Sequence, residues 1–371
     1  MAAGFFHITY KKDRIFGLDL MRAIAIITVL LGHSNLIIKD TAPAFANLPL
    51  PNGVELFFVL SGFLIGQIIF TQLNKRHFSS FGDLLRFWRF RWFRTLPNYY
   101  LVLVLNLGLA YFGLTKYALS SFSWKFWLFL QNFAWPFYGF YPESWSLAIE
   151  EWFYLLFPIT LILTLRILRK LSAQWVSLFV IAVFILVPIW LKYNFAEHTT
   201  FASADDWSKN MRRVVIYRLD SIMLGVLFAW FSFYYQSFFK RSRWILLIAG
   251  ILLNVLNRMY NLHFETVFSQ TFFLVIQGIS MAMLLPFFAH WRKASGFLAR
   301  FITYISVVSY AMYVVHFSLV LYPMAHFITF GDGAAAWGYY AVFFGATLLL
   351  SHVLYKYFEK PMTDLRKRKS I

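Results

Sequence analysis

The stretch GLDLMRAIAIITVLLGHSN, residues 17–35, decides the class of fold. It is long and apolar enough to cross a bilayer, whose hydrocarbon core needs about 20 residues of helix. It nevertheless carries Asp19, Arg22 and His33. An ionised side chain at the centre of a bilayer costs roughly 2.5–3.5 kcal/mol on insertion scales. We therefore expect a first transmembrane helix, not a cleaved signal peptide, whose polar face looks into a helix bundle or a wet cavity.

The composition extends this conclusion to the whole chain. Its 371 residues are 60% hydrophobic and only 13% charged, whereas a soluble domain is about half apolar and a quarter charged. The sequence predicts an all-α, polytopic integral membrane protein. The aromatic segment 122–138 is short, so we expect it to be interfacial or re-entrant. The ten expected spans are residues 15–38, 53–72, 95–113, 145–165, 174–192, 214–235, 244–260, 266–288, 301–323 and 336–358.

The basic residues predict the orientation. With the N-terminus inside, 23 of the 34 Lys and Arg residues fall in inner segments and seven in outer loops. This bias is typical of the positive-inside rule and predicts that both termini are cytoplasmic. It also accounts for the net charge of +18 without a nucleic-acid partner. The absence of cysteine excludes disulfides, thiolate metal sites and a cysteine acyl intermediate.

Arg22 and His33 are predicted to share one face of the first helix. They are eleven residues apart, which is three turns plus about 20° and a rise of roughly 16 Å. Asp19 lies one turn before Arg22 and can neutralise it. The alternative interpretation is a structural Asp–Arg pair with an ordinary buried histidine.

Two further stretches carry features that bear on packing and on ligands. In GVELFFVLSGFLIG, residues 53–66, we expect Glu55 at the outer boundary and a small-residue surface around Gly62 that a second helix can approach. In FWRFRWFRTLPNYY, residues 87–100, arginines alternate with aromatic residues. Arginine binds phosphate bidentately, but the same pattern is typical of a basic segment anchored on anionic lipid.

The remaining intramembrane ionisable residues are candidates for function. Glu150 and Glu151 lie about two turns inside the fourth span and point to different faces, so at least one faces the bundle. We expect Glu143 to be solvated at the outer boundary. Asp220 lies early in the sixth span and His316 in the middle of the ninth, where a histidine is either a packing residue or functional. The sequence has no histidine pair with metal-ligand spacing and no glycine-rich phosphate loop, so we expect no metal.

Seven stretches, in order and nearly end to end, together resemble the membrane-bound acyltransferase-3 family, whose members O-acylate bacterial surface and exported glycans. The resemblance implies ten core helices in the bacterial inner membrane, a cytoplasmic acyl-CoA donor such as acetyl-CoA, and a glycan or lipid-linked sugar acceptor on the outer side. The matching stretches are GLDLMRA with LLGHS, GVELFFVLSGFLI, RWFRTLPNYY, SWSLAIEEWFYLLFP, RLDSIMLG, SYAMYVVHFSLV and FEKP.

The resemblance also implies roles for individual residues. It assigns Arg22 and His33 to the reaction and matches Glu150 to the acid that follows WSLA. His33 would act as general base or carry the acyl group, Glu150 could orient it, and Arg22 could stabilise the oxyanion. The CoA-binding element is best matched by Arg91 and Arg94, with Arg89 beside them. The expected supporting residues are Asp19, Glu151, Asp220 and His316.

Other interpretations remain. Many relatives carry a soluble, esterase-like C-terminal domain, whereas we expect residues 1–371 to form a single membrane domain without one. A separate periplasmic acyltransferase would then complete the transfer, or the membrane domain would acylate the acceptor alone. Ten spans with buried charges also fit a transporter or flippase, although the halves of the chain show no repeat, and a receptor or structural membrane protein is a third alternative. Turnover of acyl-CoA separates these classes.

Overall fold

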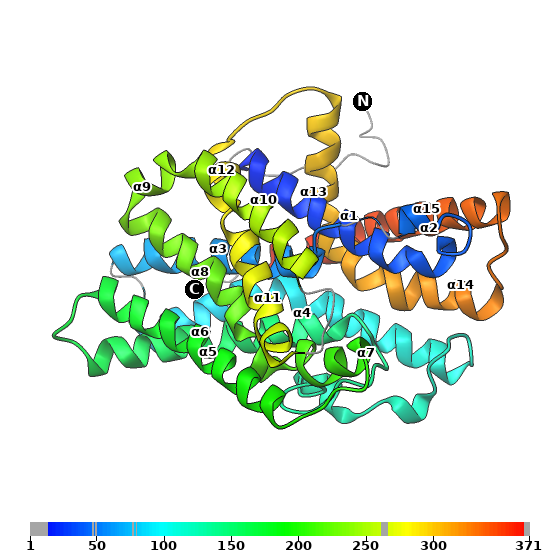
Figure 1. The fold of residues 1–371 in the computed structure, drawn as a ribbon, viewed down its shortest axis with the longest axis horizontal. Helices are drawn as coiled ribbons and strands as arrows, with labels where there is room; N and C mark the ends of the chain where they lie inside the picture. The colour runs from blue at the N-terminus through cyan, green and yellow to red at the C-terminus, as the bar shows by residue number, and fades with distance from the viewer. Residues whose placement is uncertain are drawn as a thin grey trace.

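A computed structural model describes residues 14–366, apart from 47, 49, 76, 77, 79 and 261–265. Within these residues the chain is helical and contains no strand, as expected (Figure 1). Six basic residues in the inside–outside count lie outside the described residues: Lys11, Lys12, Arg76, Lys367, Arg368 and Lys369.

Sixteen α-helices follow one another in the described part of the chain. They are α1 (Phe16–Ile38), α2 (Pro43–Ala46), α3 (Gly53–Asn74), α4 (Phe81–Tyr111), α5 (Ser144–Ile167), α6 (Ala173–Glu197), α7 (Ala204–Trp207), α8 (Leu219–Tyr234), α9 (Gln236–Arg241), α10 (Arg243–Tyr260), α11 (Val267–Ala282), α12 (Leu285–His290), α13 (Phe297–Val315), α14 (Tyr322–Phe327), α15 (Ala334–Leu354) and α16 (Lys360–Leu365). Short 3₁₀ turns lie at Leu119–Ser121, Trp124–Leu128 and Val215–Tyr217, and π-helical turns at Ser208–Arg212, His316–Leu321 and Tyr355–Glu359.

Eight stretches of the described chain are long and apolar enough to cross a membrane, which makes this a multi-pass membrane protein. The expected span 214–235 corresponds to α8, which has only 16 residues. The expected span 95–113 falls in the second half of α4, whose first half carries the arginines. The count of ten spans and the cytoplasmic termini therefore stay predictions. The eight stretches are Phe16–Ile38, Gly53–Asn74, Ser144–Ile167, Ala173–Glu197, Arg243–Tyr260, Val267–His290, Phe297–Phe327 and Ala334–Leu365.

Small residues let two central helices pack closely. α3 lies along α8, and α1 packs against both α3 and α13. A Cβ atom on Gly62 would lie 1.8 Å from the carbonyl oxygen of Ile222, and one on Gly225 would lie 2.0 Å from that of Val59. Neither position can hold a larger side chain unless the helices separate. The expected small-residue surface around Gly62 is therefore confirmed, with α8 as its partner.

Two fully buried ion pairs connect α3, α6 and α8. Arg218 pairs with Glu55, and the Lys192 ammonium lies 2.6 Å from the Asp220 carboxylate. None of these four side chains is exposed. Glu55 lies in the first turn of α3 and is buried, and Arg218, directly before α8, supplies the counter-ion that a buried carboxylate needs.

Candidate active site

Helix α1 presents its two candidate catalytic residues to separate cavities. Arg22 lines a cavity between α1, α3, α4, α5 and α13. His33, eleven residues further along, lines two other cavities beyond that one. The rise between them is roughly 16 Å, so one helix connects two distinct regions of the protein.

The first region, which we call the arginine cavity, is lined by Arg22, Arg91, Arg94 and Glu150 and has a volume of about 90 Å³. The two arginines of α4 are one turn apart, which places them on one helix face. Three cations therefore surround a single carboxylate. All four residues were predicted from the sequence as site residues, and all four line this one cavity.

Glu150 is held in place by hydroxyl groups. Its Oε1 accepts hydrogen bonds from Ser61, at 2.5 Å, and from the Tyr154 hydroxyl. The guanidinium of Arg91 lies over the Tyr154 ring, 5.4 Å from its centroid. Tyr154 was not anticipated from the sequence, although it lies four residues after Glu150 and therefore on the same helix face.

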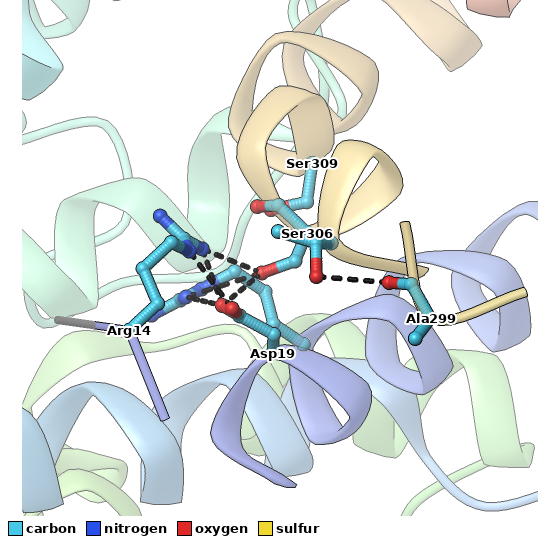
Figure 2. Close-up of polar contacts among 7 residues, drawn as sticks. Arg14, Asp19, Ala299, Ser306 and Ser309 are labelled. Carbon is cyan, nitrogen blue, oxygen red and sulfur yellow. Dashed lines mark hydrogen bonds and ion pairs between the residues drawn. The ribbon is translucent and has the colours of Figure 1, made fainter. Parts of the chain in front are cut away.

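Asp19 is shared between two arginines. It accepts a hydrogen bond from the Arg14 Nε at 2.8 Å and another from the Ser306 hydroxyl at 2.8 Å (Figure 2). The Arg22 Nη1 is farther away, at 3.7 Å from Asp19. Neutralisation of Arg22 by Asp19 is therefore partial, because Arg14 takes the closer position. Arg22 keeps a charge that can act on a ligand in the arginine cavity.

Besides Asp19 and His316, three candidates do not line any of these three cavities. Arg89 donates to the carbonyl oxygen of Arg366 at 3.2 Å. Glu151 is buried and accepts a hydrogen bond from Thr95 at 2.6 Å. Asp220 is the buried partner of Lys192. The consecutive acids Glu150 and Glu151 do point to different faces, and only Glu150 lines the arginine cavity.

His33 has an unanticipated partner in His316. The His33 Nδ1 lies 2.7 Å from the His316 Nε2, and the two rings are nearly parallel, with their centroids 5.0 Å apart. The His316 Nδ1 lies 2.7 Å from the Tyr313 carbonyl oxygen. Because a carbonyl oxygen only accepts, the neutral His316 carries its hydrogen on Nδ1 and accepts through Nε2. His33 then donates through Nδ1, and its Nε2 keeps a free lone pair.

This geometry corrects the expectation that Glu150 orients His33. Glu150 lines the arginine cavity together with Arg22, and its acceptor oxygen is occupied by Ser61 and Tyr154. The side chain that contacts the His33 Nδ1 is the imidazole of His316.

Glu143 stabilises the turn that begins at His316. Its Oε1 accepts the backbone N–H groups of Phe317, at 3.2 Å, and Ser318, at 2.8 Å. Glu143 is only 3% exposed, so the expectation that it is solvated is wrong. Burial raises the pKa of Glu143 to about 7, and the two backbone donors partly offset this effect. Its partners come from the π-helical turn His316–Leu321, which a sequence motif does not reveal.

Two cavities of about 490 Å³ each flank His33. The His33–Lys116 cavity is also lined by Lys39, and the His33–Arg212 cavity is also lined by Arg258. Val54 lines both the His33–Arg212 cavity and the arginine cavity. At this point one residue of α3 faces both cavities.

The fold and these cavities define a multi-pass membrane protein with a charged intramembrane site. The chain belongs to the acyltransferase-3 family, because the family's sequence model, described as an acyltransferase domain, matches residues 15–356. This confirms the family resemblance read from the sequence.

Similar proteins are named as O-acetyltransferases. The peptidoglycan O-acetyltransferase OatA of Listeria monocytogenes is 29% identical over 51% of this chain and 30% of its own length. SACOL0978 of Staphylococcus aureus (strain COL), which carries the name of an O-acetyltransferase, is 24% identical over 95% of this chain and 58% of its own length. The chain thus spans less than two thirds of these relatives. No solved structure matches it.

Proposed function

We propose that this protein is a membrane O-acyltransferase of the bacterial inner membrane. It would move an acyl group, acetyl in the first instance, from cytoplasmic acyl-CoA to a hydroxyl of an exported or surface glycan. The observation that carries the proposal is the arrangement along α1: Arg22 lines the arginine cavity, and His33, whose Nδ1 contacts His316, lines the cavities beyond.

The residues of the arginine cavity fit an acyl-CoA donor. Arg91 and Arg94 supply planar guanidinium groups, which suit the phosphates of CoA. The cavity, at about 90 Å³, is smaller than an engineered void of about 150 Å³ that admits benzene. The cavity therefore holds only a small part of the donor, and the rest of the CoA molecule would extend out of it. The donor would supply an activated thioester, and no metal is needed for the step.

The transfer step is a nucleophilic substitution at the thioester. The acceptor hydroxyl oxygen attacks the carbonyl carbon, so a C–O bond forms and the C–S bond breaks. The hydroxyl proton moves to the His33 Nε2 and from there to the departing CoA sulfur, which leaves as a thiol. Arg22 lines a different cavity, a rise of roughly 16 Å along α1 from His33, so in this step it would act on the donor in the arginine cavity and not on the oxyanion next to His33. The same His33 nitrogen would carry the acyl group if the transfer ran in two steps.

His316 acts as a positioning residue in this proposal. It holds the His33 Nδ1–H, and so fixes both the tautomer and the ring orientation. Since His316 is itself held by the Tyr313 carbonyl oxygen, the chain of hydrogen bonds ends on the backbone and not on a carboxylate.

The test uses purified protein in lipid nanodiscs with radiolabelled acetyl-CoA and a glycan acceptor. Wild type is compared with His33→Ala and Arg22→Ala, and folding is monitored by thermal denaturation. We expect thioester turnover in wild type and its loss in both variants. Unchanged turnover in His33→Ala would remove this histidine from the chemistry. No turnover and no CoA binding in any sample would favour the transporter or flippase instead.

A further inference from the structure

The region around His33 is cationic. Lys39, Lys116, Arg212 and Arg258 line the His33–Lys116 and His33–Arg212 cavities. No aspartate or glutamate is among the described residues that line either of them. The excess positive charge therefore lies where the proposed acceptor must bind, and it is separate from the charge of the arginine cavity.

Arg212 is the best-placed of these cations. It ends the π-helical turn Ser208–Arg212, and its guanidinium lies over the Trp145 ring, 5.5 Å from the centroid. Its Nε is buried and has no hydrogen-bond partner, and within the described part of the chain it forms no ion pair. Glu55, a nearby acid, is already paired with Arg218. Burial lowers the pKa of Arg212 only to about 10, so the group is charged at neutral pH.

The rest of the His33–Arg212 cavity suits a sugar. Its volume of about 490 Å³ lies within the range of roughly 300–1,000 Å³ usual for ligand sites. The side-chain amides of Asn52 and Gln277 line it and are 3.1 Å apart. Amides donate and accept hydrogen bonds and so match hydroxyl groups, whereas an arginine with a free donor matches an anion.

We infer that the His33–Arg212 cavity binds an acceptor glycan that carries an anionic group, a carboxylate or a phosphate, close to the hydroxyl that is acylated. This inference rests on the proposed function and names its substrate class. Arg212 and Arg258 hold the anion and thereby bring the hydroxyl to the His33 Nε2. Arg212 has no acidic partner among the described residues, so an anionic ligand would supply its counter-ion. The phosphates of CoA are the competing source of negative charge.

The experiment compares acceptors that differ only in charge. The first pair is an oligosaccharide containing N-acetylmuramic acid and its carboxamide, and the second is a sugar phosphate and the unphosphorylated sugar. Transfer from radiolabelled acetyl-CoA and equilibrium binding are measured for each. One charge-assisted hydrogen bond contributes about 1.5–3 kcal/mol. In at least one of the two pairs, wild type should therefore bind and acylate the anionic acceptor about 10- to 100-fold better than its neutral counterpart.

Two variants isolate Arg212. Arg212→Gln should bring the preference close to one, whereas Arg212→Lys should keep part of it. The matched control is Arg213→Gln, because the neighbouring Arg213 is already paired with Asp205 at 3.6 Å. This control should leave the preference unchanged.

The outcomes separate this inference from the proposed function. Equal use of charged and neutral acceptors by wild type would overturn the inference while leaving acyl transfer intact. A raised KM for acetyl-CoA in Arg212→Gln, with the acceptor ratio unchanged, would assign Arg212 to the donor and also overturn it. If no transfer occurs at all, the inference is tested by equilibrium binding: equal affinity for the charged and neutral members of both acceptor pairs would overturn it. If Arg212→Gln does not fold, the salt dependence of acceptor binding to wild type is measured instead. Binding of the anionic acceptor should weaken as ionic strength rises, and binding of the neutral acceptor should not.

Discussion

Replacing His316 by leucine tests whether this histidine orients His33 or takes part in the chemistry. The substitution removes the acceptor that lies 2.7 Å from the His33 Nδ1. His33 then chooses its tautomer freely, and part of the population places its hydrogen on Nε2, where it cannot accept a proton.

The expected loss follows from the kind of hydrogen bond. A bond between two neutral imidazoles contributes about 0.5–1.5 kcal/mol, which corresponds to a fall of about two- to tenfold in kcat. Removing the base itself, in His33→Ala, should cost about 10²- to 10⁴-fold. We therefore predict a much smaller loss of kcat in His316→Leu than in His33→Ala. The KM for acetyl-CoA should not change in His316→Leu.

The assay is steady-state transfer of radiolabelled acetyl groups by protein in nanodiscs. His316→Gln should recover activity, because its amide oxygen can accept from the His33 Nδ1. The matched control is His352→Leu. His352 is equally buried and contacts the Tyr304 hydroxyl at 3.0 Å, away from the cavities. It should lower thermal stability without lowering kcat.

Two results would refute this account of the histidine pair. A loss in His316→Leu as large as that in His33→Ala would mean that His316 itself moves a proton or contacts substrate. Full activity in His316→Leu would mean that the tautomer is fixed by something else.

Three further predictions concern the donor site, the buried charges and pH. Arg94→Gln should raise the KM for acetyl-CoA about 10- to 100-fold, because a charged hydrogen bond contributes about 1.5–3 kcal/mol. The control Arg89→Gln, whose side chain lies outside the arginine cavity, should leave this KM unchanged. Equal effects of the two substitutions would contradict the donor assignment. Lys192→Met leaves Asp220 as an unpaired buried charge and should cost about 3–5 kcal/mol of unfolding free energy, measured in denaturant; a cost below 1 kcal/mol would argue against the pair. Because the pKa of Glu143 is raised to about 7, the native protein binds this proton more tightly than the unfolded chain. Its stabilising contribution is complete below about pH 4.5 and is lost as pH rises through 7. Thermal denaturation of wild type should therefore show this fall in stability relative to Glu143→Gln, and parallel pH profiles would refute the prediction.

Much of the fold could be predicted from the sequence because its cause is local. Each apolar run must form a helix to satisfy its backbone in lipid, and most of the expected spans coincide with described helices. The common helix of Arg22 and His33 follows from their spacing alone. The close contact at Gly62 follows from its lack of a side chain. Prediction was weaker at the start of α8, where Arg218 and Asp220 are neutralised only by the distant Glu55 and Lys192.

The partners of the polar residues were decided by tertiary structure. His316 reaches His33 across 283 positions of sequence, and Glu143 reaches the backbone of Phe317 across 174. The spacing of these residues in the sequence does not reveal either pairing. Both pairings depend on how α1, α5 and α13 are rotated against one another. The sequence by itself determined which helices carry charge and which family the chain resembles. Only the packed bundle decided which charges neutralise each other and which, like that of Arg212, are left for a ligand.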